Sequence, residues 1–164
     1  MTRRKDAESF TFRAAMGQPD QIDRVALDAG GERVEAVTLR VGNPQCVVLG
    51  GGLTRERLHS VAAGLSTHAH FAEGTNVELA TVESPERVRI LIWERGVGPT
   101  EASGTGACAA AVAAMQFGGA SRVVDVVSPG GTQRVEWLDD GLYLTGAASL
   151  IGEVETFGEE PRWR

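Results

Sequence analysis

The sequence has little cysteine, no long apolar run and no excess of basic charge. Its two cysteines, Cys46 and Cys108, can form one disulfide at most, and neither belongs to a Cys-x-x-Cys pair of the kind that binds zinc. No segment approaches the roughly 18 consecutive apolar residues of a membrane-spanning helix. The charged N-terminal segment is not followed by the apolar core of a signal peptide. We therefore expect a cytoplasmic protein in which both cysteines are reduced.

Acidic residues outnumber basic ones. The net charge is −6 over 164 residues, and the nearest thing to a basic cluster is Arg3-Arg4-Lys5 near the N-terminus. Nucleic-acid binding requires clustered Lys and Arg, so we expect neither a nucleic-acid nor a membrane partner. The length suits one globular domain and is short for two. We expect a single domain over residues 1–164, with a frayed tail at 158–164.

Short alternating apolar segments separated by glycine-rich turns predict many strands. A helix is expected from its N-cap at Thr54 to about Leu65, because apolar residues recur there on one helical face. The expected strands are 10–16, 22–27, 34–41, 46–49, 77–82, 88–93, 122–127, 133–137, 142–145 and 150–155.

A second helix, over 104–115, carries no charged residue on any face. A helix that is apolar all round must be buried, and its many alanines let strands approach closely. Many strands and one buried helix predict an α+β fold, in which a curled, mostly antiparallel sheet wraps round a central helix.

The start of this helix is a candidate anion site. Ser103 falls at the N-cap, and Gly104 and Gly106 leave the backbone amides free of Cβ atoms. The first amides of a helix have no intrahelical partner and lie at its positive end, so a carboxylate or phosphate would fit there. The alternative is structural: Ser103 caps the helix, and the glycines permit tight packing.

Four polar residues upstream have the same two interpretations. Glu94 and Arg95 end an apolar strand, so one of them faces the interior unless the strand end is exposed. Asn43 precedes a proline and Asn76 begins a strand, where asparagine either holds a turn or contacts a ligand.

Three segments resemble diaminopimelate epimerase. They are Val41-Gly42-Asn43-Pro44-Gln45-Cys46, Gly74-Thr75-Asn76-Val77-Glu78, and Trp93 to Gly98 running on through Ser103-Gly104-Thr105-Gly106-Ala107-Cys108. They occur in the family's order at about its spacings, and the resemblance extends over about residues 10–154. It covers the C-terminal half of the family's sequence.

The resemblance implies an epimerase that interconverts LL- and meso-diaminopimelate, in lysine and peptidoglycan precursor synthesis, without pyridoxal phosphate or metal. The family has two similar domains, and one cysteine from each acts as acid or base at the substrate α-carbon. The amides of Gly104 and Thr105 would hold the carboxylate at that carbon. The polar groups of the substrate's distal end would contact Asn43, Asn76, Glu94 and Arg95.

This chain departs from the family in its acid–base residues. The family's cysteine in this half is Ser103 here, and a hydroxyl is a far weaker acid than a thiol. The family usually has histidine where Gln45 stands, and glutamine cannot accept a proton. Cys108 lies too far along the helix to substitute and is expected to be structural. His68-x-His70 lacks further ligands for a metal site.

The family's first domain has no counterpart among these residues. We expect either a partner domain of the missing type or a second copy of this chain, as a homodimer, to complete the site. The isolated chain is then a half-site that is weakly active or inactive. The alternatives are a non-catalytic module that binds amino acids or assembles with a partner, and a related dehydratase or epimerase that uses one hydroxyl residue.

Overall fold

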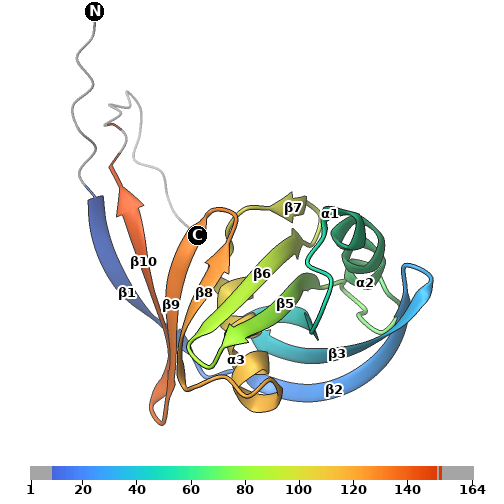
Figure 1. Ribbon diagram of the computed structural model, residues 1–164, viewed down its shortest axis with the longest axis horizontal. Coiled ribbons are helices and arrows are strands. Elements are labelled where there is room, and N and C mark those ends of the chain that lie inside the picture. The colour runs from blue at the N-terminus through green and yellow to red at the C-terminus, as the bar shows by residue number, and fades with distance from the viewer. Residues whose placement is uncertain (1–8, 151, 153–164) are drawn as a thin grey trace, which may run out of the picture.

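The computed structural model describes residues 9–150 and 152 (Figure 1). The strand expected at 150–155 and the tail at 158–164 lie almost wholly outside these residues, and Leu150 is in no strand. The described strands are β1 (Ser9–Gly17), β2 (Asp20–Ala29), β3 (Glu32–Val41), β4 (Asn43–Leu49), β5 (Asn76–Ser84), β6 (Arg87–Glu94), β7 (Gly98–Thr100), β8 (Val123–Ser128), β9 (Gly131–Leu138) and β10 (Gly141–Ser149).

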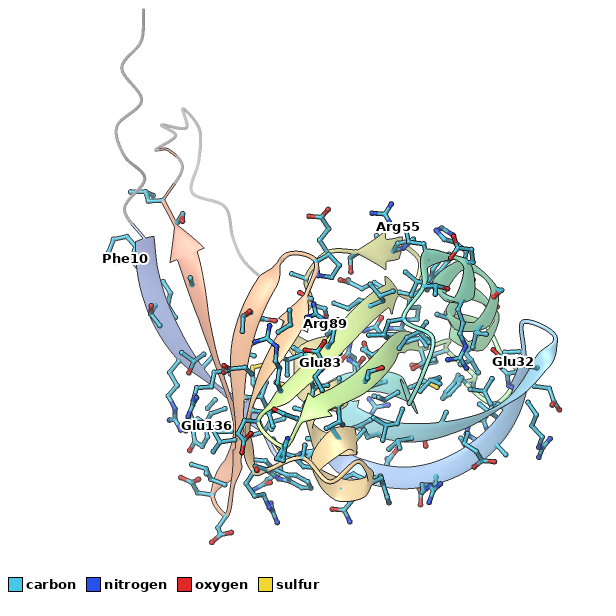
Figure 2. All side chains as sticks on the ribbon, viewed as in Figure 1. Phe10, Glu32, Arg55, Glu83, Arg89 and Glu136 are labelled. Atoms are coloured by element: carbon cyan, nitrogen blue, oxygen red, sulfur yellow. The ribbon has the colours of Figure 1, made fainter. Side chains whose placement is uncertain are left out.

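The strands form one curled sheet of ten strands, in the order β1-β10-β9-β8-β6-β5-β4-β3-β2, with β7 paired to β6. Neighbouring strands are antiparallel except for β4 with β5 and β6 with β8, which are parallel. Figure 1 shows β1 and the end of β10 projecting from the rest of the sheet. The exposed Phe10 lies on this projection (Figure 2). The mostly antiparallel sheet expected from the sequence is confirmed.

The central helix is α3 (Gly104–Phe117), which packs against strands from β3 to β10. Every residue from Gly106 to Ala114 is buried. The six alanines of this stretch lie among valines, leucines and isoleucines of the surrounding strands. Small side chains allow the strands to approach the helix axis from several sides. The buried helix expected from the absence of charge is therefore confirmed.

A second helical layer covers the opposite face of β2–β6. It consists of α1 (Arg55–Arg57), a π-helical turn at Leu58–Ala62, and α2 (Ala63–Ser66). The Thr54 hydroxyl caps its start by accepting a hydrogen bond from the Arg57 amide at 3.1 Å. Among the described residues, no helix is long and apolar enough to cross a membrane.

The strands that the sequence predicts within the described residues are all present, and most are longer at their ends. The short strand β7 was not predicted, because it is held by pairing with β6 and has no apolar pattern of its own. On the outer surface, Glu83 at the end of β5 forms ion pairs with Arg87 and Arg89 of β6 (Figure 2).

Candidate functional site at the start of the central helix

Three neighbouring strands bring polar side chains to one edge of the sheet. β4 and β5 run parallel with Gln45 opposite Asn76, and β5 runs antiparallel to β6 with Val77 opposite Trp93. The start of β4, the start of β5 and the end of β6 therefore meet. Side chains alternate along a strand, so Asn43, Asn76 and Glu94 share one face of the sheet.

This shared face is the one that contacts α3. Val47, Ala80 and Ile92, at even spacing from the polar residues along β4, β5 and β6, pack in the core cluster that contains α3. Cys46 and Val77, at odd spacing, pack in the other cluster, beneath α1 and α2. The three strands thus present polar groups toward α3 at one edge and apolar groups along its length.

The first turn of α3 has one amide capped and two amides free. The Ser103 hydroxyl accepts a hydrogen bond from the Gly106 amide at 3.2 Å, and the Ser103 carbonyl accepts from the Ala107 amide. Within residues 9–150, the amides of Gly104 and Thr105 donate to no protein acceptor. Residues 103–105 are half-buried. The positive end of α3 is therefore neither sealed in the core nor fully solvated.

The two glycines of this turn make room for the protein's own side chains, whereas the sequence suggested room for a ligand. A Cβ at Gly104 would lie 3.1 Å from a methyl group of Leu144. A Cβ at Gly106 would lie 2.6 Å from Oε1 of Glu78. Tight packing therefore accounts for both glycines. The groups that this turn offers to a ligand are the two free amides of Gly104 and Thr105.

The side chains of Asn43, Asn76 and Glu94 each have one hydrogen bond to the protein and one polar group without a partner among the described residues. Asn43 Oδ1 accepts from Gln45 Nε2 at 2.7 Å, and Asn76 Oδ1 accepts from the Arg95 amide at 2.9 Å. Glu94 Oε1 accepts from the Thr100 hydroxyl at 2.8 Å. Both asparagine NH₂ groups and Glu94 Oε2 have no partner within the described part of the chain.

Arg95 is the residue that the structure sets apart. Its side chain is exposed, and its Nη1 donates to the carbonyl of Glu73 at 2.7 Å, in the loop before β5. The backbone of Arg95 supports Asn76, while the guanidinium ties two loops together. Of the seven predicted residues, Asn43, Asn76 and Glu94 thus lie on the α3-facing side of one sheet edge, and Ser103, Gly104 and Thr105 form the start of α3. Arg95 reaches this edge through its amide.

Sequence reasoning missed Glu78, the residue most unusual in its surroundings. Glu78 is fully buried beside Gly106, and neither of its carboxyl oxygens has a hydrogen-bond partner among the described residues. Burial, and then the nearby Glu94, raises the pKa of Glu78 well above its usual value. The sequence does contain a sign of this buried acid, because Glu78 is the single acidic residue inside the apolar run 77–82.

The cysteines and histidines give no support to a metal centre. Cys46 and Cys108 are free, buried, and lie in different core clusters. Nδ1 of His68 accepts from the backbone amide of His70 at 3.1 Å, so this histidine is held by its own loop. No group of three or more metal-ligating side chains occurs in the described ranges 9–150 and 152.

Two hollows lie in the surface, and the smaller one reaches Ala102, which lies just before the helix start. The larger, of about 610 Å³, is open and lies over β2, β3, the start of β4 with Gln45, and the loop 70–74. The smaller, of about 240 Å³, includes Ala102, Gly130 and Gly146. Neither is lined by Ser103 or the asparagines. The polar groups of the sheet edge and the free amides at the helix start, together called the cradle below, are therefore not enclosed by either hollow.

Two solved structures share this architecture. A probable proline racemase from Agrobacterium radiobacter K84 matches with a TM-score of 0.62 and 14% identity, over 92% of this chain and 55% of that protein. A predicted epimerase from Pseudomonas aeruginosa matches with a TM-score of 0.56 and 17% identity, over 92% and 61%. The chain thus has the α+β diaminopimelate-epimerase-like fold, a sheet curled round a helix.

Sequence comparison is more specific. The family model for diaminopimelate epimerase matches residues 37–151, and the chain belongs to this family. The diaminopimelate epimerase of Desulforudis audaxviator is 39% identical over 162 residues, 89% of this chain and 58% of that protein. That of Desulfitobacterium hafniense is 38% identical over 135 residues, 82% and 48%. The chain spans about half the length of the curated relatives it matches.

Proposed function

We propose that this chain is the substrate-holding half of a diaminopimelate epimerase-type isomerase, in which Ser103 takes the place of a catalytic cysteine. The observation that carries the proposal is that Asn43, Asn76 and Glu94 share the α3-facing side of one sheet edge, while two amides at the start of α3 are free. Membership of the family supports the choice of an amino-acid substrate.

The unpaired groups of the cradle fit the charges of an amino acid. In the proposal, the Gly104 and Thr105 amides bind the carboxylate at the reacting carbon, aided by the helix dipole. The NH₂ groups of Asn43 and Asn76 donate to the distal carboxylate, and Glu94 Oε2 accepts from the distal ammonium. Arg95 contributes through its amide bond to Asn76, a smaller role than the sequence suggested.

Epimerisation requires proton removal on one face of the α-carbon and proton return on the other. Ser103 is poorly equipped for either step alone. A hydroxyl ionises far less readily than a thiol, and this one already accepts the Gly106 amide. Where the family usually has histidine, the buried Gln45 donates to Asn43 and offers no base. Turnover by the isolated chain is therefore weak or absent in this proposal.

The decisive experiment follows the α-hydrogen of diaminopimelate in deuterated water by proton NMR. The isolated chain is expected to show no exchange above the enzyme-free control. S103C restores a thiol at the helix start and should raise the exchange rate, whereas S103A should not. Brisk exchange by the natural chain would refute the inactivity. Equal rates for S103C and S103A would remove position 103 from the acid–base role.

A non-catalytic binding module is the second candidate, favoured by the hydroxyl that serves as a helix cap. Calorimetry with diaminopimelate separates the two functions, because a module binds the ligand while S103C remains inactive. A dehydratase with one hydroxyl residue would instead release a dehydrated product, which mass spectrometry detects.

The partner that completes the site also stays a proposal. It is either a domain carrying the family's other cysteine or a second copy of this chain. Light scattering with and without diaminopimelate tests the second option. A cytoplasmic location and independence from cofactors are further predictions from the sequence, and the chemistry proposed for these residues requires neither metal nor pyridoxal phosphate.

A further inference from the structure

Glu78 is a buried acid that the proposed site does not use. It lies on β5, two residues beyond Asn76 and on the same α3-facing side. Its side chain is 0% exposed, and both oxygens lack a hydrogen-bond partner among the described residues. Burying a polar group without a partner is unfavourable, so such a group calls for an explanation.

The position of the carboxyl group points to the first turn of α3. Oε1 of Glu78 lies 2.6 Å from the point that a Cβ of Gly106 would occupy, and Oγ of Ser103 lies 3.2 Å from the same point. The acid and the hydroxyl therefore both lie beside the missing Cβ of one glycine in the first turn of a 14-residue helix. A larger residue at 106 would displace one of them.

Within the described residues, no cation is among the groups that shift the pKa of Glu78. The charged group that acts on it is the half-buried Glu94 of β6, whereas the buried Cys46 of β4 is near enough to respond to Glu78 but packs in the other core cluster. From α3 there is only the buried Cys108, since Gly104–Phe117 contains no charged residue. Burial, and then Glu94, raise the pKa of Glu78 well above its usual value, so the surroundings of this acid favour its protonated form.

We propose that Glu78 is a positioning residue that must hold a proton for a carboxylate to bind at the first turn of α3; this rests on the proposed function. An ionised Glu78 would repel an incoming carboxylate and would itself occupy the positive end of the helix. A protonated Glu78 does neither, and its hydroxyl can donate a hydrogen bond toward the bound anion or toward Ser103. Carboxylate binding is thereby linked to one proton.

The test is calorimetry of diaminopimelate binding between about pH 5 and pH 9 on the full chain. Wild-type affinity should fall with rising pH and approach a ~tenfold loss per pH unit once Glu78 ionises. The reason is that an ionised Glu78 must take up one proton for the ligand to bind. E78Q keeps an uncharged donor of the same shape, so it should bind and lose this slope. E35Q, which removes an exposed carboxylate of β3, should keep the wild-type slope.

Titration of the ligand's own amino groups is common to all three proteins, so the comparison isolates Glu78. Binding by E78Q with an unchanged slope would overturn the inference and leave the proposed function standing. Should diaminopimelate not bind at all, acetate is the second probe, followed by NMR shifts of the Gly104 and Thr105 amides. Acetate binding with the Glu78-dependent slope would sustain the inference while the proposed function fails. Binding of neither probe overturns both.

Stability of the ligand-free chain gives an independent check. A pKa raised in the folded state means that the unfolded chain loses the Glu78 proton first. The free energy of unfolding of wild type, relative to E78Q, should therefore fall as pH rises above the usual glutamate pKa of about 4.3, and level off only above the folded pKa. A difference that does not change with pH would mean that Glu78 is ionised in the fold, and the inference would be wrong.

Discussion

Gly106 lies next to the two oxygen-bearing groups on which the proposals depend, the Glu78 carboxyl and the Ser103 hydroxyl. The Gly106 amide donates to one of them, and the missing Cβ leaves space for the other. At this residue the backbone and two side chains constrain one another. The absence of a side chain is thus a structural requirement of the first turn.

Replacing Gly106 with alanine should expose this constraint. Alanine favours a helix over glycine by at most about 1 kcal/mol, but its Cβ would lie 2.6 Å from a buried oxygen. We expect G106A to lower the free energy of unfolding by about 1–3 kcal/mol in urea titrations, the usual range for overpacking.

The matched control is G64A, in α2, where a Cβ would lie 3.4 Å from the Ala29 side chain, an ordinary contact. G64A should be neutral or stabilising by up to about 1 kcal/mol. In an E78A background the loss from G106A should shrink, because the blocking carboxyl is gone. Equal stability of G106A and G64A would argue against a carboxyl group beneath the turn.

Residue identity predicted much of the candidate site, and local pattern could not supply the rest. Ser103 as N-cap and the polar ends of β4, β5 and β6 follow from motif and spacing. The Arg95 side chain points outward because its guanidinium donates to the Glu73 carbonyl in the loop before β5. No sequence pattern predicts the position of that carbonyl. Glu78 is buried because β5 lies in the middle of the sheet, and strand order is a property of the whole fold.

At the scale of elements, the sheet encloses α3. Ala109, Ala110 and Ala111 are fully buried although they point in different directions round the helix. Each direction is covered by strands, since α3 contacts strands from β3 round to β10. A larger side chain on any of these positions has no free volume to enter.

A110L tests this enclosure. The added atoms must push strands away from the helix, so we expect a loss of about 1–3 kcal/mol in the free energy of unfolding. Q116L, on the exposed end of the same helix, should change stability by less than about 0.5 kcal/mol. Thermal and urea unfolding of both variants provide the comparison. If A110L is no less stable than Q116L, α3 is not enclosed by strands on all sides.

The helical layer over the other face shows a limit of periodicity. Apolar spacing correctly predicted a helical run beginning at its Thr54 cap. It did not predict the π-helical turn at Leu58–Ala62, because a π turn changes the backbone register without requiring a particular residue type. Packing of Leu58, Val61 and Ala62 into the cluster beneath this layer accommodates the change.

At the scale of the whole molecule, two apolar layers share one sheet. Cys46 belongs to the layer beneath α1 and α2, and Cys108 belongs to the layer round α3. Adjacent residues of β4 and β5 alternate between the two layers, so neither layer can lose its strands without disrupting the other. The single domain expected from the length therefore predicts that both layers unfold together.

The two natural cysteines can test this cooperativity without any substitution. Both thiols are fully buried. Burial raises the pKa of Cys108 to about 12 and, together with the nearby Glu78, raises that of Cys46 further above its usual value. Neither should react with a thiol reagent in the native protein at neutral pH. With increasing urea, mass spectrometry of labelled peptides should give one common midpoint for both cysteines.

S60C supplies the control, since an exposed thiol on the helical layer should react fully without urea. The contrary result has a specific meaning. If Cys46 becomes labelled at lower urea than Cys108, the layer beneath α1 and α2 opens on its own. The prediction of a single domain would then be wrong, because the sheet shared by the two layers would not be enough to couple their unfolding.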